Sequence, residues 1–341
     1  MCNFRIKDRL FPVILSFFLT KLKNSIPWSF RIFSVKEKTN PTMKLNLFLL
    51  LGFLYCFTAK AQQLPNSNIM LFELNQKNDS TFLFNNPQYL TNFNKDGYNN
   101  QPYFITDNEL YITVQLSTDT CQTDIYSLNL ANKEITQVTA TIESEYSPTF
   151  IPPTGSEKNY EFSSVRSDKA GNQNLWRFPI NRSSKGSPVL NTIKNIGYHY
   201  WIDYRDIVLF VVDKPHKMLV ADTRDESARF VTANIGRCFQ ELPDGSVAFV
   251  EKMSDDSWLL KKMDARTYRT SLITATLAKS EDFTILRDGT IIMAFGAKLY
   301  KFNQRIDTTW KEIANLSFYG MDNISRIAVN GAENKIAIVV E

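Results

Sequence analysis

Apolar and polar residues alternate in short runs along most of this chain, and turn-forming residues separate the runs. The pattern is clearest between residues 121 and 180, where TDIYSLNL, EITQVT, EYSPTFIPPTG and NLWRFPI follow one another. A period of two is typical of β-strands, and runs this short between turn signals predict a four-stranded antiparallel sheet. A sustained helical period is absent from the sequence, so we expect an all-β protein.

One strand of this sheet recurs along the chain. Copies of DIYSLNL begin at residues 124, 174, 217, 258 and 298, at spacings of 50, 43, 41 and 40 residues, and IMLFELN at residue 69 is a sixth copy. Hairpin turn signals recur with the copies, at Asp107-Asn108, Thr154-Gly155, Arg205-Asp206, Asp244-Gly245, Asp288-Gly289 and Asn330-Gly331. Four strands per unit at this period predict a six-bladed β-propeller of four-stranded antiparallel blades.

The two ends of the repeat region each hold half a blade. Two strands within residues 69–91 have no partners before them, and two more occupy residues 324–341. We expect the N-terminal pair to complete the C-terminal blade and so close the ring without an exposed edge. A β-sandwich or an irregular all-β domain is the alternative, but it leaves six recurrences in the same order to coincidence.

The first 61 residues are predicted to lie outside this domain. Met43-Lys44, the apolar run 45–58 and Ala59-Lys60-Ala61 have the three parts of a signal peptide, so we expect residues 43–61 to be cleaved and the propeller domain to occupy 62–341. Residues 1–42 are interpreted as an upstream extension, although the apolar run 10–19 is a possible second anchor. The apolar run is too short for a comfortable membrane span, and the mature chain is expected to be exported without one.

Charge excludes one class of partner. The whole chain carries a net charge of +4, but residues 1–61 hold ten Lys and Arg against Asp8 and Glu37. The remaining 29 basic and 33 acidic residues give the body a net charge of −4. Nucleic-acid binding requires clustered basic residues, so no nucleic-acid partner is predicted.

The segment 145–180 resembles the WD40-like repeat of TolB-type six-bladed propellers. The matching residues are Ser147-Pro148-Thr149-Phe150, Gly155, the loop 167–172 (SDKAGN) and Leu175-Trp176, whereas later repeats keep only Pro-Asp-Gly or Arg-Asp-Gly turns. The resemblance implies the propeller fold and an exported location, of a kind found in envelope proteins of Bacteroidetes-type bacteria. TolB carries a separate α/β domain with no counterpart here, so a role in the Tol system is not implied.

Residues for catalysis are few. The two histidines, His199 and His216, lack metal-ligand spacing, so neither a metal nor a cofactor is predicted. The G-x-S-x-G elbow of propeller-bearing peptidases is absent from the sequence. Carboxylates at Asp255-Asp256, Asp282 and Asp322 keep a glycosidase possible, but its mechanism depends on their separation. Cys121 and Cys238 fall in opposite blades and are expected to be free, largely buried thiols.

Propellers bind ligands at the mouth of the central channel, where each innermost strand begins. Alignment of the blades on their turns places six candidate binding residues there: Asn100, Tyr146, His199, Arg237, Asp282 and Asp322. Their mixed charge favours a polar or peptide ligand over a phosphate. The sequence therefore favours a non-catalytic exported scaffold that binds an envelope protein or glycan. The alternative is a polysaccharide hydrolase or lyase that uses carboxylates at the channel mouth.

Overall fold

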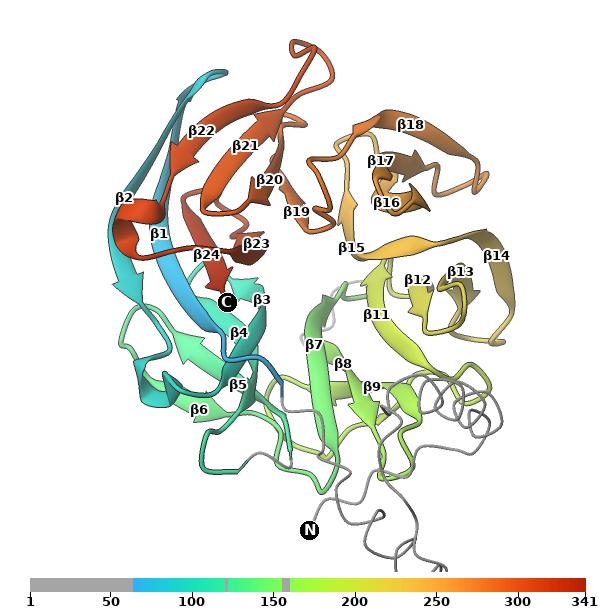
Figure 1. The fold of residues 1–341 in the computed structure, drawn as a ribbon. Helices are drawn as coiled ribbons and strands as arrows, with labels where there is room; N and C mark the ends of the chain where they lie inside the picture. Colours follow the sequence, from blue (N-terminus) through green and yellow to red (C-terminus); the bar gives the residue numbers. More distant parts are fainter. Residues whose placement is uncertain (1–63, 120–121, 155–159) are drawn as a thin grey trace, which may run out of the picture. The chain divides into compact units, whose positions relative to one another are not determined.

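Six blades surround a central channel in the computed structural model, as predicted (Figure 1). The structure describes residues 64–341, except 120–121 and 155–159. Each blade is a four-stranded antiparallel sheet, and the first strand of every blade lies next to the channel. The predictions for residues 1–61 and for Cys121 concern residues outside this description.

The blades are numbered in chain order from the first complete sheet. Blades 1 and 2 contain β3 (Tyr98–Thr106), β4 (Glu109–Gln115), β5 (Asp124–Asn129), β6 (Ile135–Gln137), β7 (Ser144–Ile151), β8 (Glu161–Ser167), β9 (Gln173–Pro179) and β10 (Ser187–Pro188). Blades 3 and 4 contain β11 (Ile196–Trp201), β12 (Asp206–Val211), β13 (Lys217–Asp222), β14 (Ala228–Ala233), β15 (Ile235–Glu241), β16 (Val247–Ser254), β17 (Ser257–Met263) and β18 (Thr270–Ala275). Blade 5 contains β19 (Phe283–Ile285), β20 (Ile291–Phe295), β21 (Lys298–Phe302) and β22 (Lys311–Asn315). Two short 3-10 helices, η3 (Asn92–Asn94) and η4 (Ser317–Tyr319), precede β3 and β23.

Blade 6 closes the ring. Its strand order is β2-β1-β24-β23, with β1 (Asn68–Asn78) and β2 (Thr81–Tyr89) from the N-terminal side and β23 (Ile324–Val329) and β24 (Lys335–Val340) from the C-terminal side. β1 and β24 pair antiparallel from Asn68↔Val340 to Glu73↔Lys335. The predicted closure is confirmed, and its backbone hydrogen bonds hold together two segments more than 250 residues apart in the 341-residue chain.

The hydrophobic core lies between the blades. Among the described residues, six buried clusters each join two neighbouring blades, and one of them joins blades 6 and 1. The second strand of a blade therefore packs on both of its faces. It reads as a continuous apolar run rather than the alternating one predicted, as in DIVLFV of β12 and KIAIVV of β24.

Turns between first and second strands link several blades on one face of the ring. Asp107 of blade 1 accepts hydrogen bonds from Asn330 Nδ2 (3.0 Å) and Ala332 N (2.7 Å) of blade 6. Arg287 of blade 5 donates to the Gly331 carbonyl of the same blade 6 turn. The turn residues recognised in the sequence therefore also connect neighbouring blades.

Cys238 is a buried free thiol on β15, and its Sγ lies 3.2 Å from the Phe283 carbonyl oxygen of blade 5. Burial raises the pKa of this thiol well above its ordinary value. Within the part of the chain that the structure describes, no helix has the length and apolar character needed to span a bilayer.

Candidate binding site at the channel mouth

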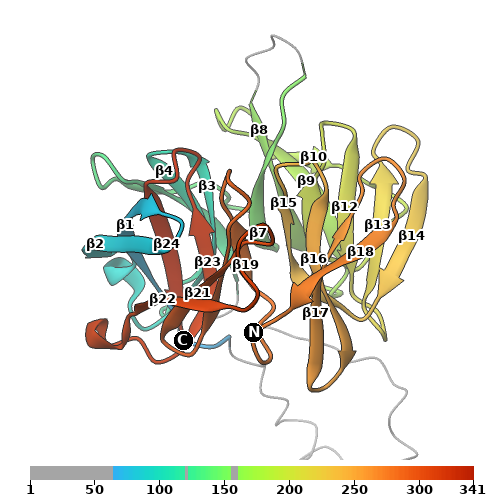
Figure 2. The same ribbon diagram turned by 90° about the horizontal axis from the view of Figure 1, so that it is seen from above.

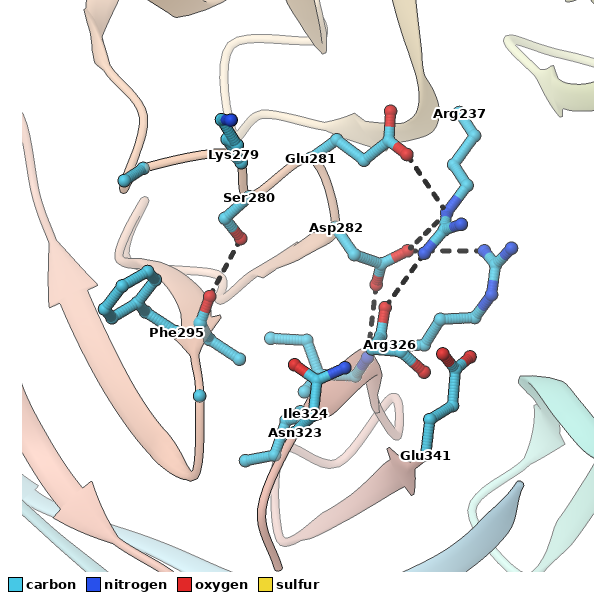
Figure 3. A pocket seen from close by; sticks show the side chains of 15 residues that line it. Arg237, Lys279, Ser280, Glu281, Asp282, Phe295, Asn323, Ile324, Arg326 and Glu341 are labelled. Carbon is cyan, nitrogen blue, oxygen red and sulfur yellow. Dashed lines mark hydrogen bonds and ion pairs between the residues drawn. The ribbon is translucent and has the colours of Figure 1, made fainter. Parts of the chain in front are cut away.

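A pocket of about 360 Å³ opens beside the channel, between blade 5 and blade 6 (Figure 3). Its walls come from the loop before β19, the β20–β21 hairpin, the start of β23 and Arg237 of β15. These segments meet because antiparallel strands alternate in direction. The start of a first strand and the turn between second and third strands therefore reach the same face.

Two arginines converge on one carboxylate in this pocket. Arg326 Nη1 lies 3.3 Å and Arg237 Nε 3.9 Å from Asp282 Oδ2 (Figure 3). The Ile327 backbone N–H donates to Asp282 Oδ1 at 3.2 Å. Burial raises the pKa of Asp282, and the guanidinium groups of Arg326 and Arg237 counteract part of this rise.

The other two carboxylates of the pocket are also engaged. Glu281 Oε2 lies 2.6 Å from Lys252 Nζ, and its Oε1 lies 3.6 Å from Arg237 Nε. Glu341 Oε1 accepts a hydrogen bond from Asn100 Nδ2 at 3.3 Å. Each acidic group that lines the pocket thus has a cation or an amide as its partner.

Tyrosines continue the lining from the pocket along the channel. Arg326 donates to the Tyr198 hydroxyl at 2.9 Å, and its guanidinium carbon lies 5.2 Å from the centroid of that ring. Tyr98 lies near enough to Arg326, Tyr198, Tyr146 and Arg237 to interact with them electrostatically, and burial raises its pKa. The channel mouth is therefore a mixture of phenol rings, guanidinium groups and one buried carboxylate.

Of the six residues proposed from the sequence, Arg237 and Asp282 line the pocket, and Tyr146 lies beside the other tyrosines of the channel. Asn100 is buried and reaches the pocket through Glu341. Asp322 is exposed and does not line the pocket.

His199 points between blades instead of toward the pocket. Its Nε2 lies 2.6 Å from Ser163 Oγ, which also accepts a hydrogen bond from Trp201 Nε1 at 2.8 Å. Burial lowers the pKa of His199 to about 3, so the ring is neutral, and the direction of its hydrogen bond with Ser163 depends on the tautomer. The adjacent residue, Tyr198, contacts Arg326, because successive side chains of a strand point to opposite faces.

Sequence reasoning missed Arg326, Glu281, Ser325 and Glu341 as pocket residues. Arg326 lies four positions after the proposed Asp322, on β23 itself rather than in the loop before this strand. Two adjacent acidic residues at Glu281-Asp282, just before a strand, were the available signal.

The arrangement offers ionic and hydrogen-bonding groups but no metal site. Across residues 64–341, leaving out 120–121 and 155–159, no group of three or more His, Cys, Asp or Glu side chains could hold a metal ion. His216 packs against Phe210 at a centroid distance of 4.7 Å.

The fold and channel define this protein as a six-bladed β-propeller of the type seen in TolB proteins. No protein-family model and no curated protein matches the chain. Among solved structures, a TolB-type protein of Agrobacterium tumefaciens is similar at a TM-score of 0.58 and 10% identity, over 81% of this chain and 98% of that one. TolB of Acinetobacter baumannii is similar at a TM-score of 0.50 and 11% identity, over 90% and 72% of the two chains.

A protein of unknown function from Bacteroides thetaiotaomicron is similar at a TM-score of 0.50 and 9% identity, over 80% of this chain and 76% of that one. Identities this low establish a shared fold and carry no information on the ligand.

Proposed function

We propose that this protein is an exported, non-catalytic scaffold of the cell envelope that binds a partner at the channel mouth. The observation that supports this proposal most strongly is the lining of the mouth, where Arg237, Asp282 and Arg326 form a cluster of ion pairs beside tyrosines. Such a surface offers hydrogen bonds, aromatic contact area and charge complementarity, which are the features of protein recognition sites. The signal-peptide pattern of residues 43–61 and the TolB-like fold support the envelope location.

The state of the carboxylates argues for binding rather than catalysis. A glycosidase of the usual kind needs one carboxylic acid and one free carboxylate on opposite sides of the bond it cleaves. In the pocket, Glu281, Asp282 and Glu341 are each held by Lys252, the arginines or Asn100. We therefore place the polysaccharide hydrolase or lyase second.

Purification of the protein from its native host tests both parts of the proposal. Mass spectrometry is expected to find Gln62 at the N-terminus and the same envelope partner in repeated preparations. An intact Met1 would contradict cleavage of the signal peptide. Release of reducing ends or unsaturated sugars from a panel of polysaccharides, abolished by Asp282→Asn, would replace the scaffold proposal with the enzyme.

A further inference from the structure

Two donors at the pocket have no hydrogen-bond partner among the described residues, although one of them, Arg237 Nε, is ion-paired. Arg237 Nη2 donates to the Ser325 carbonyl at 3.1 Å, but its Nε is buried and makes no hydrogen bond to any described residue. The carboxylates nearest to this Nε, at 3.6 and 3.9 Å, are beyond hydrogen-bond distance. Ser325 Oγ is likewise buried without a partner among the described residues.

Unpaired buried donors of this kind destabilise the folded state, because they have lost their hydrogen bonds to water. Both belong to residues that line the same pocket of about 360 Å³. A ligand oxygen that accepts from them would recover this cost, and a charged oxygen would do so most strongly beside two guanidinium groups.

The charge of the pocket favours one negative charge over two. Its basic side chains are Arg237, Lys279 and Arg326, and its acidic ones are Glu281, Asp282 and Glu341. Because these balance, the pocket has no net charge to attract an anion, and repulsion by its three carboxylates is about twice as strong for a phosphate dianion as for a single carboxylate, so the smaller charge is the better tolerated. Arg237 is the more accessible of the two arginines, since its side chain is 30% exposed against 11% for Arg326.

One wall of the pocket is apolar, and apolar groups continue across the same face. Phe295, in the β20–β21 turn, is 52% exposed and stands beside Ala294 and Ile324. The equivalent turns of blades 3 and 4 expose Val212 and Met253. Figure 2 shows the β16–β17 hairpin and the end of the chain on the same side of the ring. The exposed Phe295 ring at the edge of the pocket can pack against an apolar residue of a polypeptide, a contact that a free small acid lacks.

We propose that the pocket recognises an Asp or Glu side chain of a partner polypeptide, with an adjacent apolar residue of that partner packed against Phe295. The inference rests on the proposed function and adds the chemistry by which the partner is recognised. The acidic side chain accepts hydrogen bonds from Arg237 and Ser325, and the volume of about 360 Å³ has room for it.

Titration of the protein with two capped dipeptides, followed by two-dimensional NMR, tests this recognition. Acetyl-Leu-Glu-methylamide is expected to bind at least about tenfold more tightly than its Leu-Gln counterpart, with shifts at Phe295, Gly296 and Ser325. Arg237→Met should remove this preference, and Ser325→Ala should lower the affinity for the acidic dipeptide about fivefold. Arg266→Met, which removes an exposed arginine from the β17–β18 turn, is the matched control and should change neither value.

Equal binding of the two dipeptides, or an unchanged preference in Arg237→Met, would overturn the inference. Saturable binding of acetate or inorganic phosphate as tight as that of the acidic dipeptide would also overturn it, in favour of a small-anion site. Capture of the native partner separates this result from the broader proposal. If Arg237→Met still captures that partner, the scaffold stands and the pocket is not its recognition site.

Discussion

Two acidic clusters at the starts of inner strands differ in what surrounds them. In blade 5, Glu281 precedes the channel residue Asp282. Lys252 Nζ lies 2.6 Å from Glu281 Oε2 and neutralises this glutamate. In blade 2, Glu145 precedes Tyr146, and its side chain is fully buried with Arg166 Nε 3.5 Å away. One strand position thus gives an open, charged pocket in one blade and a closed interface in the other.

In the closed cluster of blade 2, the carboxylate of Glu145 is less completely paired with a cation than Glu281 is in blade 5. Arg166 Nε lies closer to Glu143, at 2.5 Å, and the guanidinium group of Arg166 also lies over the Trp176 ring. Glu145 therefore receives only part of the electrostatic stabilisation that Arg166 can give. Glu145 Oε1 accepts from Thr141 at 2.5 Å, but Oε2 is buried without a hydrogen-bond partner among the described residues. Burial raises the pKa of Glu145 to about 7, and the nearby Asp124 adds to the rise. Pairing with a cation therefore decides whether a buried carboxylate stays charged.

Removal of Arg326 should have the largest effect on stability. Arg326 and Asp282 are 11% and 13% exposed, so Arg326→Met leaves a buried carboxylate with only the more distant Arg237. We expect the free energy of unfolding, measured by urea denaturation, to fall by about 3–5 kcal/mol. Arg237→Met, which leaves the closer Arg326–Asp282 pair in place, should cost less than about 1 kcal/mol. Similar losses in both variants would contradict the assignment of Arg326 as the main partner.

The closed cluster should make stability depend on pH. The folded state holds the Glu145 proton up to about pH 7, above the ordinary value of 4.5, so the contribution of Glu145 to stability is most favourable at low pH and declines as pH rises between these values. The decline attributable to Glu145 is expected to reach about 3 kcal/mol.

Urea denaturation at pH 5 and pH 8 measures this decline. Glu145→Gln should lose most of the difference between the two pH values, because an amide carries no charge at either. Glu281→Gln, the matched change in the open cluster, keeps Glu145 and should retain the wild-type difference. A Glu145→Gln profile that follows the wild type would show that another group sets the pH dependence.

Loss of the uncharged hydrogen-bonded pair Ser163–His199, between blades 2 and 3, should reduce the free energy of unfolding by a smaller amount. Ser163→Ala removes the hydrogen-bond partner of His199 Nε2 and of Trp201 Nε1, both of which are buried. The expected loss is about 1–3 kcal/mol in the same assay, since two buried groups lose a partner. Ser183→Ala, an exposed change in the β9–β10 loop, provides the reference and should be close to neutral.

The smallest effect is expected at Asp322. This residue was proposed from the sequence as part of the channel mouth, but it is exposed and does not line the pocket. Asp322→Asn should change stability by less than about 0.5 kcal/mol, and it should leave the preference for the acidic dipeptide intact. A tenfold loss of that preference would extend the pocket to this loop.

Local pattern was sufficient for the architecture. Turn pairs such as Asp244-Gly245 and Asp288-Gly289 depend on backbone conformations with φ of +78° and +84° at glycine, so the sequence marks them directly. The repeat period gave the blade count, and the unpartnered strands at either end predicted the closure by β1 and β24. These features follow from residues that are near one another in the chain or from a repeat that can be counted.

The site required the tertiary structure. Sequence alignment on turns found Arg237 and Asp282, but it could not tell that Tyr198 rather than His199 contacts Arg326, because one residue of register reverses the direction of a strand side chain. It also could not show that Arg326, from the neighbouring blade 6, neutralises Asp282. The sequence by itself determined the strands, the turns and the number of blades. Only the closed ring decided which charges meet, because ionic contacts depend on distances between blades that local pattern does not encode.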